Sequence, residues 1–434
     1  MVTSATFFVL FVITTALGKQ GFGPTDQDWG FVTVREKAHL FWWLHLTTAD
    51  VPSPTDKPLI LWLQGGPGSS STGFGNFVEL GPLDTDLKPR TSTWVQYANV
   101  LFVDNPVGTG FSYVEDESLL VKSNSQIADD FLVFLKEFFK RRSDFAKVPF
   151  YIFTESYGGK MTVEIALKLH QEIAAGNIEC NLTGIALGDS WISPADSVVN
   201  YAPFLLQMGV LDSRGFEKID KVARLLPDLV ENKKYAEAFG IWRGVEYEIK
   251  ANTYGVDMYN VLTKKKSSSS VPDPTNYPGQ PGTPPDADSK VNSIMNNLVR
   301  EALNVTQPWG TTDEAVFDVL TGPEGDFMKP VVDIVERLLN ETDIQVSVYT
   351  ADFDLICNTL GTMAWIYNMN WKDKENWNKA TRVPYAVDGY YQGYEKKFNN
   401  FALYWVVRSG HMVPADNPAG MYHILQDVTY DFAV

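Results

Sequence analysis

Ser156 has the sequence context of a catalytic serine. It stands in the segment Thr154-Glu155-Ser156-Tyr157-Gly158, which follows an apolar run at 149–153 and precedes a stretch of helical periodicity. A strand, a tight turn and a helix in this order form a nucleophile elbow, which exposes the serine Oγ above a sheet. The alternative is a serine that only caps the following helix. Because a hydroxyl is a weak nucleophile until a base takes its proton, a histidine must reach Ser156.

Three histidines follow Ser156 in the chain, and His411 is the best placed of them to act as that base. His170 lies 14 residues along the helix that begins at Ser156, roughly 21 Å away at the helical rise, which excludes it. His423 falls inside a later helix and is interpreted as a packing or surface residue. His411 follows an apolar run at 401–407, and loops at the carboxyl ends of strands carry the ligand-facing residues of open α/β sheets.

The acid that orients the histidine should directly follow another strand, between Ser156 and His411 in the sequence. A strand predicted at 344–349 runs into Thr350-Ala351-Asp352-Phe353-Asp354. Either carboxylate, of Asp352 or of Asp354, could hold the imidazole tautomer and stabilise the imidazolium. The spacing alone does not choose between them.

The surrounding sequence alternates strand and helix patterns, which predicts an α/β fold with a mostly parallel sheet flanked by helices. The expected strands are 38–46, 58–64, 99–104, 148–153, 182–189, 344–349 and 401–407; the expected helices are 127–142, 157–175, 330–339, 358–367 and one after Pro418.

Residues 201–310 interrupt that alternation with charged helical segments. They predict a helical cap inserted between two parts of one core, 19–200 and 311–434. Within the cap, residues 264–290 are rich in Pro, Gly and Ser and predict an exposed, flexible, protease-sensitive loop.

The N-terminus predicts export. Residues 1–18 contain an apolar run too short to span a bilayer, followed by Ala16-Leu17-Gly18, which fits a signal peptide cut after residue 18. A buried core segment is the alternative. Three acceptor sequons, at Asn181, Asn304 and Asn340, support glycosylation in the secretory pathway. We therefore expect a secreted or lysosomal glycoprotein.

The composition and net charge of the chain exclude some classes of protein and of binding partner. The 434 residues are 44% hydrophobic and 21% charged, which excludes a disordered or fibrous chain, and the net charge is −17. Such a charge argues against nucleic acid and against an anionic membrane surface as partners. No stretch after the signal peptide predicts a membrane anchor. The sequence leaves both a monomer and a homodimer open.

The two cysteines, Cys180 and Cys357, are too few for a disulfide scaffold, and the histidines lack the spacing of metal ligands. We expect no metal and no cofactor. Cys180 should lie at the opposite edge of the sheet from Cys357, farther than the roughly 7 Å that a disulfide allows. Both are therefore predicted to be free thiols, with Cys357 close enough to the site to make it sensitive to thiol reagents.

Five motifs then follow one another along the chain: Trp-Leu-Gln-Gly-Gly-Pro-Gly-Ser-Ser at 62–70, Phe-Val-Glu-Leu-Gly-Pro at 77–82, Asp-Asn-Pro-Val-Gly-Thr-Gly-Phe-Ser-Tyr at 104–113, Glu-Ser-Tyr-Gly-Gly at 155–159 and Gly-His-Met-Val-Pro at 410–414. Together they resemble the serine carboxypeptidase family, most closely its retinoid-inducible branch, over about residues 28–428. The resemblance implies an α/β-hydrolase fold with a helical cap. It also implies the release of C-terminal residues from peptides that carry a free C-terminus.

The resemblance implies roles for individual residues. It makes Ser156, Asp354 and His411 the catalytic triad, because the family's acid occupies the last position of the Gly-Asp-x-Asp-type turn. It implies that the backbone N–H groups of Gly66 and Tyr157 form the oxyanion hole, where preorganised donors meet the developing negative charge.

The resemblance also implies a cluster that binds the substrate's α-carboxylate: Gln64, Gly65, Glu79 and Glu155. Ionising both of two neighbouring carboxyl groups is costly, so one should stay protonated and donate a hydrogen bond to the substrate carboxylate. Peptidase activity should therefore favour acidic pH. An ordinary charge at a helix end is the alternative for Glu79. The chain departs from the family at Gln64, where Asn is common, and at Ser69, where a cysteine often forms a disulfide.

Two other functions use the same residues differently. An acyl-enzyme on Ser156 can pass its acyl group to an alcohol instead of water, which would make the protein an acyltransferase. A non-catalytic glycoprotein that acts as a binding partner is the third alternative. Intact Ser156, Asp354 and His411, together with both glutamates, favour the hydrolase.

Overall fold

The computed structural model describes residues 19–263, 286–310 and 313–431. Within these ranges twelve strands form one sheet in the order β1-β2-β3-β5-β4-β7-β8-β9-β12-β11-β10, and β6 pairs with β3. The strands are β1 (Lys19–Gln20), β2 (Asp26–Arg35), β3 (Ala38–His45), β4 (Leu59–Leu63), β5 (Asn99–Val103), β6 (Tyr113–Val114), β7 (Pro149–Glu155), β8 (Asn181–Gly188), β9 (Gln345–Ala351), β10 (Val383–Val387), β11 (Tyr390–Phe398) and β12 (Phe401–Val406).

The six central strands, β5, β4, β7, β8, β9 and β12, run parallel, so their carboxyl ends meet at one edge. The mostly parallel sheet expected from the sequence is confirmed. Antiparallel strands extend it on both sides, and β2, β10 and β11 were not predicted. Most residues of these outer strands are exposed or only half-buried, so the strands lack the fully buried run of a central strand.

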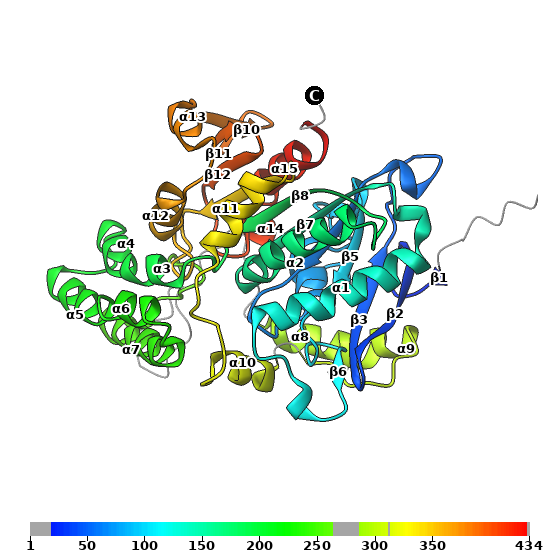
Figure 1. Cartoon of the computed structure of the whole chain (residues 1–434), viewed down its shortest axis with the longest axis horizontal. Helices are drawn as coiled ribbons and strands as arrows, with labels where there is room; N and C mark the ends of the chain where they lie inside the picture. Colours follow the sequence, from blue (N-terminus) through cyan, green and yellow to red (C-terminus); the bar gives the residue numbers. More distant parts are fainter. Residues whose placement is uncertain (1–18, 264–285, 311–312, 432–434) are drawn as a thin grey trace, which may run out of the picture.

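Both faces of the central strands are buried because successive side chains point to opposite sides. In β4, Leu59, Leu61 and Leu63 join the core that lies under α1, α2 and α11, whereas Ile60 and Trp62 join the core under α15. Figure 1 shows α1, α2 and α11 along one face of the sheet. This two-sided burial fixes the register of the strands and hence the position of the residues that follow them.

Fifteen α-helices occur within the described ranges: α1 (Asn124–Arg141), α2 (Tyr157–Ala174), α3 (Pro194–Val199), α4 (Tyr201–Gln207), α5 (Ser213–Ala223), α6 (Leu226–Glu231), α7 (Tyr235–Thr253), α8 (Ala287–Ser293), α9 (Arg300–Ala302), α10 (Glu314–Thr321), α11 (Val332–Glu341), α12 (Thr359–Asn368), α13 (Lys374–Lys379), α14 (Val413–Asp416) and α15 (Pro418–Gln426). Short 3₁₀- or π-helical segments add η1 (Pro54–Asp56), η2 (Ser71–Leu80), η3 (Trp94–Gln96), η4 (Glu117–Leu119), η5 (Ser143–Phe145), η6 (Ile294–Val299) and η7 (Asp427–Asp431). No helix in this described part is long and apolar enough to cross a bilayer.

The helices between β8 and β9 lie in separate places. Helices α3 to α7 gather at one side of the molecule, next to α12, as Figure 1 shows in green. Helix α8 and η6 instead pack on β3 and η2, where Val291 and Met295 share a core with Phe41, Trp43 and Phe77.

The predicted elements and the observed ones differ at several ends. Residues 287–290, expected within the flexible loop, belong to α8, and Ala287 is buried because it packs into the core beneath η2. Helix α11 begins at Val332, two residues after the predicted start at Pro330. The predicted signal peptide at 1–18 and the loop residues 264–285 lie outside the described residues.

A buried carboxylate joins two of the sequence motifs at the sheet edge. Asp104, directly after β5, accepts hydrogen bonds from Ser70 Oγ at 2.6 Å, Thr72 N–H at 3.0 Å and Phe111 N–H at 2.9 Å. Ser70 also caps η2 by accepting from Gly73 N–H. Because η2 carries Glu79, this network fixes where that glutamate enters the site.

Candidate active site

Ser156 occupies a strained turn between β7 and α2. Its backbone has φ +60° and ψ −128°, a conformation that a residue with a side chain rarely adopts. The strain is held by hydrogen bonds from Ser156 N–H to Gly188 O at 3.0 Å and from Trp191 N–H to Ser156 O at 2.9 Å. The predicted nucleophile elbow is therefore present, and no side-chain hydrogen bond from Ser156 caps α2.

Close packing explains the glycines around this serine. A Cβ on Gly65 would lie 2.5 Å from Ser156 Cβ, and one on Gly158 would lie 2.5 Å from Leu63 O. The end of β4 therefore touches the elbow. The structure brings the 64–66 segment against Ser156, as the sequence predicted.

His411 and Asp354 form a buried pair. His411 Nδ1 lies 2.8 Å from Asp354 Oδ2, and both side chains are buried. Asp354 also accepts from the N–H groups of Ile356 at 2.9 Å and Cys357 at 3.2 Å. Burial raises the pKa of Asp354, while the neighbouring His411 opposes that shift. Since Nδ1 donates to the carboxylate, Nε2 is the ring nitrogen left to accept a proton; it is buried and has no hydrogen-bond partner among the described residues.

Asp352, the other candidate acid, bonds to a backbone group and not to the histidine. Its Oδ1 accepts a hydrogen bond from Ser409 N–H at 3.2 Å. The structure thus pairs His411 with Asp354 and leaves Asp352 to brace the loop that carries His411.

Gln64 joins two buried glutamates. Its Nε2 donates to Glu79 Oε1 and to Glu155 Oε1, both at 2.9 Å, while its Oε1 accepts from Trp62 Nε1 at 2.7 Å. The tryptophan fixes the amide orientation, so both amide hydrogens point at carboxyl groups. The second oxygens, Glu79 Oε2 and Glu155 Oε2, are buried and have no hydrogen-bond donor within the described residues.

These carboxyl groups favour protonation. Burial raises the pKa of Glu79 to about 7. Burial, and then the charge of Glu79, raise the pKa of Glu155 well above its ordinary value. Burial, and then the charge of Asp354, raise the pKa of Asp189 at the end of β8 in the same way. Buried carboxyl groups with raised pKa values thus stand at the ends of the neighbouring strands β7 and β8 and on η2.

The two predicted oxyanion donors flank the elbow. Tyr157 is the first residue of α2, where backbone N–H groups have no acceptor within the helix. Gly66 follows Gly65, which packs on Ser156, and its φ of +107° suits glycine.

A segment of the predicted insertion contacts the His411–Asp354 pair, and the sequence did not predict these contacts. We call residues 258–261 the strap. Met258 O accepts from Leu355 N–H at 3.0 Å, and Tyr259 O accepts from His411 N–H at 2.7 Å. The Tyr259 ring also packs edge-on against the His411 ring, with 5.1 Å between centroids. The strap therefore contacts both the acid loop and the histidine loop.

A side-chain bridge reinforces the strap. Asn260 Nδ2 donates to Asp416 Oδ2 at 3.2 Å, and the same oxygen accepts from Gly410 N–H at 2.7 Å. Burial raises the pKa of Asp416 to about 6. The one sequence signal for this bridge is an acid five residues after His411; nothing in the sequence marks Asn260, because the contact requires the insertion to return to the sheet.

Both cysteines are free, as predicted. Cys180 precedes β8 at its amino end, whereas Cys357 follows β9 at its carboxyl end. Possible ligand atoms of Cys357, Asp354 and His411 lie within 4.8 Å of one another. Asp354 and His411 already bind each other, and burial raises the pKa of the Cys357 thiol well above its ordinary value, so the thiolate that a metal or a thiol reagent needs is scarce.

The two rejected histidines lie where the sequence placed them. His170 is in the last turns of α2, which begins at the elbow. His423, in α15, stacks on Tyr385 and pairs with Glu395 at 2.8 Å.

Comparisons with known proteins agree with this geometry. A sequence profile described as serine carboxypeptidase matches residues 19–431. The chain is 42% identical over 411 residues to the retinoid-inducible serine carboxypeptidase of Homo sapiens, covering 91% of this chain and 90% of that protein. It is 36% identical over 428 residues to serine carboxypeptidase-like 51 of Arabidopsis thaliana, covering 93% and 92%.

A solved structure shares the fold. The crystal structure of Kex1(delta)p, a prohormone-processing carboxypeptidase from Saccharomyces cerevisiae, matches with a TM-score of 0.79 at 23% identity, covering 94% of this chain and 92% of that chain. The α/β-hydrolase fold implied by the motifs is confirmed.

The strap leads to a prediction for Asn260. Asn260→Ala removes the hydrogen bond to Asp416, so we expect kcat for a blocked dipeptide to fall by up to about tenfold while KM changes little. Steady-state kinetics and thermal melting are measured on the same preparation. Asn297→Ala, which alters an exposed amide that bonds to its own helix, should leave both parameters unchanged. Wild-type kcat in Asn260→Ala would show that the strap does not position His411.

Proposed function

The chain belongs to the serine carboxypeptidase family and is a serine-type carboxypeptidase, and from this premise we propose the roles of its residues. Ser156 Oγ attacks the carbonyl of the C-terminal peptide bond, and His411 Nε2 takes the proton and returns it to the leaving amine. Asp354 holds the imidazole and stabilises its cation. Water then releases the acyl-enzyme. The observation that carries this proposal is the buried His411, bound at Nδ1 by Asp354 and without a hydrogen-bond partner at Nε2 in the part of the chain that the structure describes.

The oxyanion of the tetrahedral intermediate would bind the N–H groups of Gly66 and Tyr157. The strained elbow supports this role, because it holds the first turn of α2 and the 64–66 segment at the nucleophile before substrate arrives. Donors fixed in advance need no reorganisation when the charge develops.

Recognition of the free C-terminus would fall to Glu79, Glu155 and Gln64. A carboxyl that keeps its proton donates to the substrate carboxylate, whereas two ionised glutamates would repel it. The raised pKa of both glutamates supports this role. Gly65 contributes by its small size, since it lets the cluster approach Ser156.

The nucleophile can be identified by covalent labelling. We expect a fluorophosphonate probe to modify Ser156, as read by peptide mapping, because Ser156 occupies the strained turn between β7 and α2. Ser156→Ala should abolish labelling, and His411→Ala should slow it by roughly a thousandfold or more. Ser143→Ala, at an exposed serine, is the matched control. Labelling at another residue, or labelling that survives Ser156→Ala, would refute the assignment.

The glutamate pair predicts the direction of the pH dependence. Because Glu79 must keep its proton to donate to the substrate carboxylate, KM for a free-acid peptide should stay low below about pH 7 and rise as Glu79 ionises above it, by up to about tenfold per pH unit. In Glu79→Gln the side chain is neutral at every pH, so this rise should disappear. An otherwise identical peptide with a C-terminal amide should show no such rise in the wild type.

Exposed Glu36→Gln controls for a general charge effect. A free-acid KM profile that is the same in wild type and Glu79→Gln would rule out the carboxylate role. The labelling experiment would still test the triad independently.

We also propose that the protein passes through the secretory pathway and is secreted or lysosomal. The supporting observation is that Asn181, Asn304 and Asn340 are all exposed, as glycan acceptors must be. Protein expressed through a eukaryotic secretory route should lose mass on treatment with an N-glycosidase, and Asn→Gln at these three positions should remove that shift. Unmodified peptides at all three sites would contradict the proposal.

A further inference from the structure

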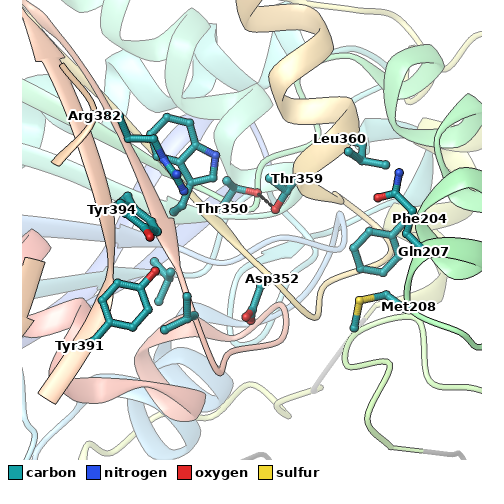
Figure 2. Close-up of a pocket in the computed structure, with 13 residues that line it drawn as sticks. Phe204, Gln207, Met208, Thr350, Asp352, Thr359, Leu360, Arg382, Tyr391 and Tyr394 are labelled. Carbon is teal, nitrogen blue, oxygen red and sulfur yellow. Dashed lines mark hydrogen bonds between the residues drawn. The ribbon is translucent and has the colours of Figure 1, made fainter. Parts of the chain in front are cut away.

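A cavity of about 250 Å³ opens at the carboxyl ends of β9 and β12, next to α4 and α12. Its lining includes none of the triad residues and none of the Gln64, Glu79 and Glu155 cluster. Figure 2 shows Arg382 and Asp352 on different walls of this cavity, with Phe204 and Met208 on a third side. The cavity therefore offers a cation, an anion and an apolar surface together.

The cation is a stacked arginine. Arg382 Cζ lies 3.5 Å from the Tyr394 ring centroid and 4.6 Å from the Trp405 ring centroid. Among the described residues no carboxylate forms an ion pair with Arg382. Stacking holds the guanidinium plane but leaves its edge N–H groups available, and this edge matches a carboxylate in a two-point hydrogen bond. A ligand carboxylate is the complementary group.

The anion on the other wall is Asp352, which the triad does not use. Its carboxylate accepts a hydrogen bond from Ser409 N–H and lines the cavity, where a ligand ammonium can donate to it. Apolar contact comes from Phe204 in α4, from Met208 directly after α4, and from Leu360 in α12. Small-molecule sites combine such apolar walls with a few converging polar groups.

We propose that this cavity binds a small apolar zwitterion, an amino acid or a dipeptide, with its carboxylate at Arg382 and its ammonium at Asp352. The volume suits a ligand of this size. A carboxypeptidase releases molecules of this chemical class, so the cavity is a product-binding site separate from the catalytic centre.

Backbone contacts connect this site to the triad. Asp352 N–H donates to Val406 O at 3.1 Å, and Phe353 N–H donates to Ser409 O at 2.9 Å. Asp354 follows two residues after Asp352, and His411 follows two residues after Ser409. A ligand ammonium that takes the Asp352 carboxylate away from Ser409 N–H loosens the loop that holds His411. Occupancy therefore lowers kcat without competing with the substrate.

The test measures binding to the full chain carrying Ser156→Ala, which cannot turn over peptides. Leucine and leucyl-leucine are the probes. Their binding is measured by calorimetry and by the change in fluorescence of Trp405, which lines the cavity. N-acetyl-leucine and leucinamide each lack one charge and should bind about tenfold more weakly. Arg382→Ala should weaken binding of the zwitterions by a similar factor. Arg337→Ala, at an exposed arginine paired with Glu341, should change nothing.

Kinetics complete the test on the protein with Ser156 intact. In the absence of added ligand, Arg382→Ala should hydrolyse a blocked dipeptide at the wild-type rate, and leucyl-leucine should lower kcat in the wild type but not in this variant. A zwitterion that binds at the catalytic centre instead can be recognised, because Arg382→Ala does not change its affinity there. Zwitterion affinity that is the same in Arg382→Ala, equal binding of the amide, or purely competitive inhibition would overturn the proposal. None of these outcomes depends on fluorophosphonate labelling, so a failed triad assignment is seen separately.

Discussion

Two buried carboxyl groups that share one amide are the constraint on which the active site depends. Gln64 can offer one hydrogen to Glu79 and one to Glu155, and Trp62 prevents the amide from turning over. The remaining oxygens of both glutamates have no donor in the described structure. Each unpaired buried carboxylate would cost several kcal/mol of desolvation free energy, and protonation of the pair avoids part of this cost. A proton at this position is therefore part of the folded site, and it is also what a substrate carboxylate needs.

The fold delivers these groups through few elements. Gln64 directly follows strand β4, strand β7 ends in Glu155 with Ser156 directly after it, and η2 carries Glu79. Because β4 and β7 are hydrogen-bonded parallel neighbours, the amide and one glutamate meet by register alone. The Asp104 network then sets the start of η2 and so brings the second glutamate in. Nucleophile and carboxylate recognition thus rest on one pair of strands.

The sequence predicted the parts of this site that follow central strands. Runs such as 58–64 and 148–153 are apolar because both of their faces are buried, so the residues after them were placed correctly at one sheet edge. Asp352 and Asp354 could not be separated by spacing, since both follow β9; the turn after the strand decides which carboxylate faces His411. The strap was missed because its contacts join residues about 95 to 150 positions apart in sequence. Strand β11 was missed because most of its residues are exposed or half-buried, so its sequence YYQGYEKKF lacks the apolar run of a central strand.

The proton on the glutamate pair can be observed directly by infrared spectroscopy of the unligated protein. The difference between wild type and a Glu79→Gln, Glu155→Gln double variant isolates the carboxyl bands of this pair from those of Asp189 and Asp354. We expect a protonated carboxyl band in that difference which persists through mildly acidic pH and loses its Glu79 part as the pH rises past about 7, while the Glu155 part remains because the pKa of Glu155 is raised well above its ordinary value. A band that is already lost near the ordinary glutamate pKa of about 4.3 would contradict a shared buried proton.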